Sequence, residues 1–284
     1  MSNEKEVIQD LLKEENYEVF RISPLSGGSI NRVYLLETSR GKIVLKLNEA
    51  GKFPEMFTAE KEGLLALLES HSLDVPKPLK AGEHGKHAFL LLEYKEQGSQ
   101  KSNFWTLFAE GLAQLHRNTN DRFGFAHSNY IGSLPQYNRW KTLASEFYIS
   151  QRLEPQFKMA SENGFDFHNL EVFYKNIEAL IPEEPPSLLH GDLWNGNYLS
   201  NEKGEPCLID PAVCYGHREM DLAMMRLFGG FPEAVFSQYH EIFPLAEGHE
   251  ERTPLWQLYY QLVHLNIFGS SYLPGVQKIV RQFS

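Results

Sequence analysis

The chain has 284 residues, a length that fits one large domain or two lobes. Its fractions of hydrophobic residues (42%) and charged residues (23%) are ordinary for a folded soluble protein. The formal net charge of -10 argues against nucleic acids and anionic membrane surfaces as partners, because both bind to basic surfaces.

The sequence also predicts where the protein works. The two cysteines, Cys207 and Cys214, do not form a CxxC pair, so we expect two buried thiols, no structural zinc site and a reducing cytoplasm. The N-terminus lacks the basic and apolar sections of a signal peptide, and no apolar run approaches the length of a membrane span. We therefore expect a cytoplasmic protein without nucleic-acid or membrane partners. The sequence leaves the oligomeric state open.

The first third of the chain combines strand signals with helical spacing. Apolar residues at helical intervals predict amphipathic helices over 4–15 and 57–68. Short apolar runs separated by turn residues predict an antiparallel sheet, with strands near 19–22, 33–36, 43–47, 79–83 and 87–93.

The remainder of the chain is mostly helical in pattern. Helical spacing recurs over 104–115, 137–153, 166–180, 219–228, 232–241 and 253–268. Among these helices, two short apolar runs at 188–190 and 207–210 predict a small β-hairpin. The pattern indicates an α+β fold with a small β-rich N-terminal lobe over 1–95, a polar linker over 96–102 and a larger, mainly helical C-terminal lobe over 103–284.

Polar residues follow these two apolar runs in an order that suits phosphoryl transfer. That reaction needs a carboxylate to orient the attacking hydroxyl, a metal to bridge the phosphates and a cation beside them. Asp192, in the segment HGDLWNGN at 190–197, is the candidate carboxylate. Asn197 lies five positions later, which is the separation between the catalytic Asp and a metal-binding Asn in protein kinases. Asp210 ends the second run, and its carboxylate oxygens are hard ligands of the kind that Mg²⁺ prefers.

Each of these residues alone has an ordinary structural alternative. A single Asp in a loop usually forms a turn or caps a helix, and Asn195-Gly196 is a common turn. Asp210-Pro211 could simply end a strand. The prediction therefore rests on the order of the whole set along the chain.

Lys46 is the candidate cation for the phosphates of ATP. It ends a Val-Leu-Lys run on the third predicted strand, where a lysine among apolar neighbours must find an anion or extend to solvent. Glu60, on the following helix, is the candidate partner that holds it. The alternatives are an exposed edge-strand lysine and a solvated glutamate.

Two weaker signals point to nucleotide contacts in the first lobe. Gly27, Gly28 and Ser29 join two predicted strands, and glycines allow backbone N–H groups to approach phosphate oxygens, although they also form ordinary hairpin turns. The strand that ends at Glu93 and Tyr94 offers its backbone to the edge of an adenine. The Walker pattern GxxxxGK[ST] is absent, which argues against a P-loop nucleotide hydrolase.

These segments together resemble the fructosamine kinase (ketosamine-3-kinase) family. The resemblance is carried by HGDLWNGN at 190–197, DPA at 210–212, YGHRE at 215–219, DLA at 221–223 and LFGGFP at 227–232. It extends over nearly the whole chain, but the block from 188 to 232 is highly specific and the first-lobe motifs are much less so.

The resemblance implies a protein-kinase-like fold, which the family shares with aminoglycoside phosphotransferases and choline kinases. It implies ATP-dependent phosphorylation of the 3-hydroxyl of a ketosamine, on a small molecule or on a glycated protein lysine, as a step of deglycation repair. The ketosamine would be a fructosamine or a ribulosamine. By resemblance, Asp192 is the base, Asn197 and Asp210 bind Mg²⁺, and Lys46 with Glu60 serves the phosphates of ATP.

The resemblance also implies a nucleotide hinge at Glu93, Tyr94 and Lys95. The chain departs from the family at one point in the glycine loop. Many members carry a cysteine there and this chain carries Ser29, so the resemblance does not extend to thiol-based control through that loop.

Trp194, His217 and Glu219 are candidate contacts for the acceptor, with Trp194 as an apolar face against the sugar. Alternatively, His217 and Asp221 brace the catalytic loop through buried hydrogen bonds. Two other functions stay open at this point. One is a kinase for another small alcohol, such as an aminoglycoside or choline. The other is a nucleotide-binding module without turnover.

Overall fold

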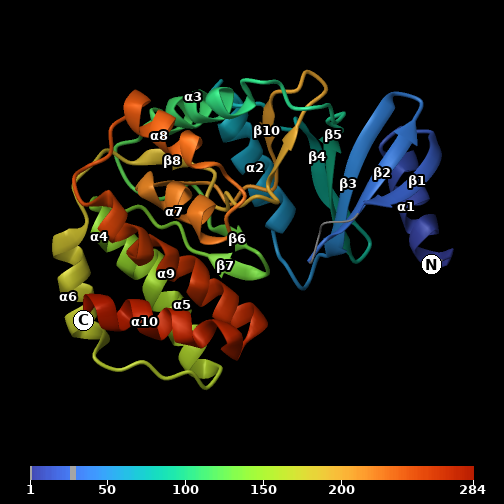
Figure 1. Cartoon of the computed structure of the whole chain (residues 1–284). Helices are drawn as coiled ribbons and strands as arrows, with labels where there is room; N and C mark the ends of the chain where they lie inside the picture. The colour runs from blue at the N-terminus through green and yellow to red at the C-terminus, as the bar shows by residue number, and fades with distance from the viewer. Residues whose placement is uncertain (1, 26–29) are drawn as a thin grey trace.

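The computed structural model describes residues 2–25 and 30–284. The predicted glycine loop at Gly27, Gly28 and Ser29 lies outside the described residues. Figure 1 shows a β-sheet at one end of the molecule and a larger, mainly helical part at the other. The predicted α+β fold is confirmed, whereas the lobe boundaries at 1–95, 96–102 and 103–284 stay a prediction.

In the described part of the chain, the first sheet has five antiparallel strands in the order β1-β2-β3-β5-β4. Alternation along β3 sends Leu45 and Leu47 into a core with the first helix, α1, while Val44 and Lys46 face the opposite side. The bounds of these elements are Ser2–Glu14 (α1), Val19–Leu25 (β1), Arg32–Thr38 (β2), Gly41–Glu49 (β3), Pro78–His84 (β4) and His87–Glu93 (β5). Helix α1 therefore covers the face of the sheet that turns away from Lys46.

Helix α2 (Met56–Glu69) belongs to a core that continues from the sheet into the helical part. Phe57 and Leu64 of α2 share this core with Phe108 and Leu112 of α3 (Phe104–His116). Because α2 packs on both parts, it holds Glu60 at a fixed place between them.

The helical part surrounds α9 (His249–Phe268), whose Trp256, Tyr259 and Tyr260 are buried. Its helices are Ala144–Phe147 (α4), the π-helix Tyr148–Leu153, Glu154–Glu162 (α5), Leu170–Leu180 (α6), Glu219–Leu227 (α7), Glu233–Ile242 (α8) and, after a 3₁₀ turn at Ser270–Tyr272, Leu273–Phe283 (α10). Its strands are Asn129–Ile131 (β6), Leu134–Gln136 (β7), Ser187–Leu189 (β8), Tyr198–Ser200 (β9), Pro206–Leu208 (β10) and Cys214–Gly216 (β11). Within the described residues, no helix combines the length and the apolar character needed to cross a membrane.

Two predictions for the helical part are wrong. The apolar runs at 188–190 and 207–210 do not form a hairpin with each other, because β8 pairs with β11 and β10 pairs with β9. The predicted helix over 137–153 begins only at Ala144 and continues through the π-helix to Glu162. Residues 137–143 are not helical, because the backbone groups of Asn138 and Lys141 form hydrogen bonds with the backbone of residues 123–125.

Candidate active site

The loop that carries Asp192 begins directly after β8 and is fixed by its neighbours. Gly191 has a φ of 84°, and a Cβ at this position would collide with the Ala212 carbonyl, so glycine is required here. Asp221, near the start of α7, accepts hydrogen bonds from the backbone N–H groups of His190 at 2.8 Å and Gly191 at 2.9 Å. Asp221 is fully buried, and these two hydrogen bonds brace the loop. The sequence analysis gave this bracing role as the alternative to acceptor binding.

The structure brings Asp192 and Asn197 into contact. Asn197 Nδ2 donates hydrogen bonds to the main-chain oxygen of Asp192 at 2.8 Å and to its Oδ2 at 3.1 Å. The same nitrogen donates a longer bond of 3.4 Å to the main-chain oxygen of Asp210. One amide thus connects the predicted base with the segment of the predicted metal ligand.

The electrostatic surroundings of Asp192 favour its protonated form. Burial is the main cause that raises the pKa of Asp192 to about 7, and the nearby negative charge of Asp210 adds to it. The hydrogen bond from Asn197 acts in the opposite direction. A carboxyl group with a pKa near neutrality is well matched to proton transfer at physiological pH.

Lys46 joins the sheet to the helical part through two ion pairs. Its Nζ lies 2.5 Å from Glu60 Oε1 and 2.7 Å from Asp210 Oδ1, and its side chain is only 6% exposed. Burial alone would lower the pKa of Lys46, but the carboxylates of Asp210 and Glu60 outweigh burial and raise it. The ammonium therefore carries its charge between the carboxylates of Glu60 and Asp210, and its contact with a phosphate stays a prediction.

Asp210 occupies a strained backbone position with an accessible side chain. Its φ is 55°, in the left-handed region that an aspartate adopts rarely, and its side chain is 44% exposed. Among the described residues, no group of three or more His, Cys, Asp and Glu side chains could hold a metal ion. Mg²⁺ usually needs only one or two carboxylates and completes its shell with phosphate and water oxygens. Asp210 Oδ2 and the amide oxygen of Asn197 suit that ligand set.

The predicted hinge residues Glu93, Tyr94 and Lys95 line a polar cavity of about 680 Å³, together with residues of the β9–β10 turn. Lys95 Nζ lies 2.8 Å from Asp74 Oδ1 and 3.0 Å from Glu93 Oε2. Asp74 also accepts a hydrogen bond from Asn201 Nδ2 at 2.9 Å. The ammonium of Lys95 thus connects this segment to Asp74, and contact between the segment and a nucleotide stays a prediction.

Glu219 and His217 do not fit the acceptor role expected for them. The Glu219 carboxylate is 3% exposed and bonded to Arg252 Nη2 at 2.6 Å and Trp256 Nε1 at 2.7 Å. His217 is 2% exposed and stacks on Trp256, with 4.8 Å between the ring centroids. Both side chains were predicted from a motif, which shows the type of a residue but not its burial. In the structure both pack against residues of α9 in the interior.

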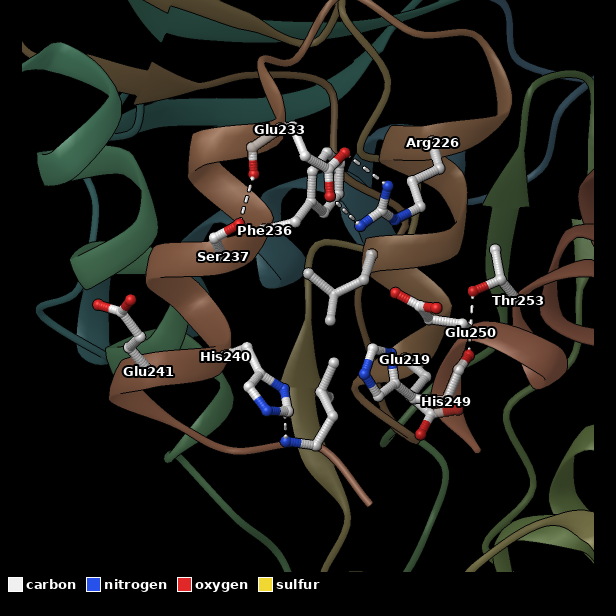
Figure 2. A pocket seen from close by; sticks show the side chains of 12 residues that line it. Glu219, Arg226, Glu233, Phe236, Ser237, His240, Glu241, His249, Glu250 and Thr253 are labelled. Atoms are coloured by element: carbon white, nitrogen blue, oxygen red, sulfur yellow. Dashed lines mark hydrogen bonds and ion pairs between the residues drawn. The ribbon is translucent and has the colours of Figure 1, made fainter. Parts of the chain in front are cut away.

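Glu219 instead lines a different cavity, of about 380 Å³, between α7, α8 and the start of α9. Figure 2 shows this cavity with the ion pair of Arg226 and Glu233 at one end and His240 and His249 at the other. None of its lining residues is Lys46, Glu60, Asp192, Asn197 or Asp210. The predicted catalytic set and this cavity are therefore separate features.

Trp194 keeps the accessibility that a sugar contact requires. It is 38% exposed, and a Cβ at Gly196 would collide with its indole, so the ring lies directly over this glycine. Contact between Trp194 and an acceptor stays a prediction.

The sequence analysis named Phe228 only within the segment LFGGFP and missed the aromatic pair that it forms with His264. Phe228, at the end of α7, is 38% exposed, and its ring centroid lies 4.8 Å from that of His264 on α9. One turn before His264, the hydroxyl of Tyr260 donates to the Gly191 carbonyl at 3.2 Å. No local motif marks His264, and only the helical spacing from Tyr260 could have placed it near the loop.

Known proteins resemble the chain over almost its whole length. The fructosamine kinase family model matches residues 1–284. A ketosamine-3-kinase of Mus musculus is 34% identical over 289 residues, which cover 91% of this chain and 93% of the relative. A chloroplastic protein-ribulosamine 3-kinase of Arabidopsis thaliana is 34% identical over 274 residues, which cover 94% of this chain and 83% of the relative.

Solved structures show the same relationship. A candidate fructosamine-3-kinase from Haemophilus somnus superimposes with a TM-score of 0.88 at 31% identity, covering 97% of this chain and 96% of that protein. A thermostable mutant of the aminoglycoside phosphotransferase APH(4)-Ia, in complex with AMP-PNP and hygromycin B, has a TM-score of 0.66 at 17% identity and covers 96% of this chain and 98% of that protein. The second likeness shows the fold alone, which is the protein-kinase-like fold expected from the sequence. With a family model that spans all 284 residues, the chain belongs to the fructosamine kinase family.

Proposed function

We propose that the chain is an ATP-dependent kinase that phosphorylates the 3-hydroxyl of a ketosamine, a fructosamine or a ribulosamine, in deglycation repair. One observation carries the proposal: Lys46 meets Asp210 beside the contact between Asp192 and Asn197, in a chain of the fructosamine kinase family. Relatives named ketosamine-3-kinase and protein-ribulosamine 3-kinase support this class of acceptor. The ketosamine is carried either by a small molecule or by a protein lysine.

Asp192 is the base of the proposed reaction. The oxygen of the 3-hydroxyl attacks the γ-phosphorus of ATP, the bond from that phosphorus to the bridging oxygen of ADP breaks, and the hydroxyl proton passes to the Asp192 carboxylate. The hydrogen bond from Asn197 Nδ2 to Asp192 Oδ2 orients the carboxylate for this task. Because little covalent work falls to the protein, the position of Asp192 is its main contribution.

Lys46, Asn197 and Asp210 serve the phosphates in this proposal. Asp210 and Asn197 would hold Mg²⁺, which would supply positive charge to the phosphates. Lys46 adds a second positive charge, and its ion pair with Glu60 at 2.5 Å holds the ammonium in place. The burial of Lys46 strengthens its interaction with a phosphate, since water screens it little.

Replacing Lys46 with methionine tests the phosphate role. We expect kcat/KM for ATP to fall about 10²-fold or more, because a preorganised charge on the transferred phosphoryl group is lost. Lys80→Met is a matched control, since Lys80 also forms one ion pair with a glutamate but has a side chain that is 52% exposed. Equal losses in the two variants, measured by steady-state kinetics, would remove Lys46 from this role.

The choice of acceptor is tested by a panel of substrates. Ribulosamine, erythrulosamine and fructosamine adducts are compared with an aminoglycoside and with choline, with ATP consumption as the readout. We expect turnover with ketosamines, and NMR of the product should show phosphate on the 3-oxygen. Phosphorylation of choline or the aminoglycoside without any ketosamine turnover would contradict the proposal and leave a kinase for another alcohol.

We also propose that the protein works in the cytoplasm. Cys207 and Cys214 are both free and buried, and burial raises the pKa of Cys214, which keeps that thiol protonated. Free thiols suit a reducing compartment. One relative is named as a chloroplastic protein, and this location is said of that relative alone.

A further inference from the structure

The hairpin formed by β6 and β7 places two amide side chains against the segment that follows Asp210. Asn129 and Gln136 are directly paired across this hairpin. Asn129 Nδ2 donates to the carbonyl of Val213 at 2.9 Å, and Gln136 Nε2 donates to the carbonyl of Ala212 at 3.0 Å. In Figure 1 the hairpin projects from the helical part toward the sheet. Two consecutive carbonyls of this segment are thus held by side chains more than 70 residues away in sequence, at separations of 84 and 76 positions.

These amides belong to a buried network with a fixed direction. Arg152 Nη2 donates to Asn138 Oδ1 at 2.8 Å, and a guanidinium can only donate, so the amide oxygen of Asn138 must face it. Asn138 Nδ2 then donates to Asn129 Oδ1 at 3.0 Å, which leaves the amide nitrogen of Asn129 for Val213. Each amide therefore has one allowed orientation.

Gln136 is oriented in the same way from a second side. The hydroxyl of Tyr259 donates to Gln136 Oε1 at 2.9 Å, and Gln136 Nε2 donates to Asn129 Oδ1 at 2.8 Å as well as to Ala212. The exposed fractions of Asn129, Gln136 and Tyr259 are 7%, 2% and 1%. A connected network of this kind, shielded from water, rigidifies what it holds.

Arg152 anchors one end of the network. Its side chain is 0% exposed, and its guanidinium donates to the carbonyl of Gln151 at 3.1 Å and lies over the ring of Phe147 at 4.5 Å from the centroid. The chains of hydrogen bonds that begin at Arg152 and Tyr259 end on the carbonyls of Ala212 and Val213.

The segment held in this way adjoins the strained Asp210. The φ of Asp210 is 55°, and such a conformation persists only where the surrounding structure fixes it. Ala212 N donates to the His190 carbonyl at 2.9 Å, so the same segment is also tied to the loop that carries Asp192. Fixing residues 212 and 213 therefore fixes both the direction of the Asp210 side chain and its distance from that loop.

We propose that Asn129 and Gln136 are positioning residues for the metal-binding carboxylate of Asp210. This inference rests on the proposed function, since it assumes that Asp210 binds the Mg²⁺ that accompanies ATP. Both amide side chains are buried and bonded within the protein, so neither is available to contact the nucleotide. They act through the backbone of residues 212 and 213, and their loss frees Asp210 to leave the geometry that the cation needs.

The test measures how much Mg²⁺ strengthens nucleotide binding in a Gln136→Met variant. Binding of AMP-PNP is measured by calorimetry with Mg²⁺ and again with EDTA, and the ratio of the two Kd values is the readout. We expect the ratio to fall about 10-fold or more in Gln136→Met, the usual size of an effect exerted through the supports of a metal ligand. Binding in EDTA should change little, because Gln136 does not contact the nucleotide.

Gln156→Met is the matched control. Gln156 is, like Gln136, 2% exposed, and its Oε1 accepts a hydrogen bond from Asn266 Nδ2 at 2.9 Å, outside the network that ends on residues 212 and 213. It should lower the melting temperature without changing the Kd ratio. If Gln136→Met does not fold, Tyr259→Phe removes only the bond that orients Gln136 and should reduce the ratio in the same direction.

The outcomes separate this inference from the proposed function. A wild-type protein that binds AMP-PNP more tightly with Mg²⁺, together with folded variants that keep the full ratio, would overturn the positioning role and leave the kinase proposal intact. A wild-type protein that does not bind AMP-PNP would contradict the kinase proposal itself. A wild-type protein that binds AMP-PNP equally well with and without Mg²⁺ would overturn the metal role of Asp210 and this inference with it.

Discussion

Replacing Asp192 with asparagine is expected to lower kcat about 10²–10⁴-fold, the range that a positioned general base contributes. The asparagine side chain has the same shape but cannot take up the proton of the attacking hydroxyl. Its contacts with Asn197 are the ones that the structure shows for the carboxylate, so the loop should keep its form. The affinity for ATP should therefore stay nearly unchanged, and the loss should appear in kcat.

Asp121→Asn provides the control for this experiment, because Asp121 is an exposed aspartate in a loop of the helical part. Single-turnover kinetics with a ketosamine acceptor, combined with nucleotide binding by calorimetry, separates the chemical step from binding. Full activity in Asp192→Asn would exclude Asp192 as the base, whereas a large loss of ATP affinity would point to a role at the phosphates.

Replacing Glu219 with alanine is expected to destabilise the protein by about 3–5 kcal/mol, which is the usual effect of leaving a buried charge unpaired. Glu219 and Arg252 are 3% and 7% exposed, and two bonds of 2.6 and 3.0 Å connect them. The variant would leave the guanidinium of Arg252 without its carboxylate and the indole N–H of Trp256 without its acceptor. Chemical denaturation followed by tryptophan fluorescence measures the change in the free energy of unfolding.

A second glutamate of the same cavity serves as the control. Glu233 pairs with Arg226 through two bonds of 2.8 and 2.9 Å, but its side chain is 70% exposed (Figure 2). Glu233→Ala should therefore cost only about 0–1 kcal/mol. If both variants lost the same small amount, the buried ion pair of Glu219 would not be a structural support, and contact with an acceptor would again be open.

The sequence predicted most of the first sheet and its helices because their signals are local. Apolar alternation along β3 and helical spacing in α2 depend only on neighbouring residues, and both elements occur where they were expected. Strand pairing in the helical part is decided instead by distant contacts. Three-residue strands such as β8 and β10 carry too few side chains to specify a partner. The hairpin of β6 and β7 gave no recognised signal for the same reason.

The candidate site shows the same contrast between contacts that are local in sequence and contacts that are distant. Asp192 and Asn197 are close in sequence, so their contact could be predicted from spacing alone. Lys46 and Asp210 are 164 residues apart, and the sequence analysis paired Lys46 only with Glu60, so the contact between Lys46 and Asp210 was not predicted. The burial of Glu219 was not predicted because its partners, Arg252 and Trp256, lie on a helix that begins 30 residues later. A motif gives the type of a residue, while burial depends on elements outside the motif.

The ion pair between Lys46 and Asp210 has a consequence for how the two parts of the protein are joined. Lys46 lies on β3 of the first sheet and Asp210 follows β10 of the helical part, so their contact at 2.7 Å connects the two parts directly. In the proposed function, a nucleotide with its own cation offers a phosphate to Lys46 and the cation to Asp210, so each of these two residues exchanges the other for a new partner of opposite charge. The proposal therefore makes nucleotide binding a change of ion-pair partners at the junction between the sheet and the helices.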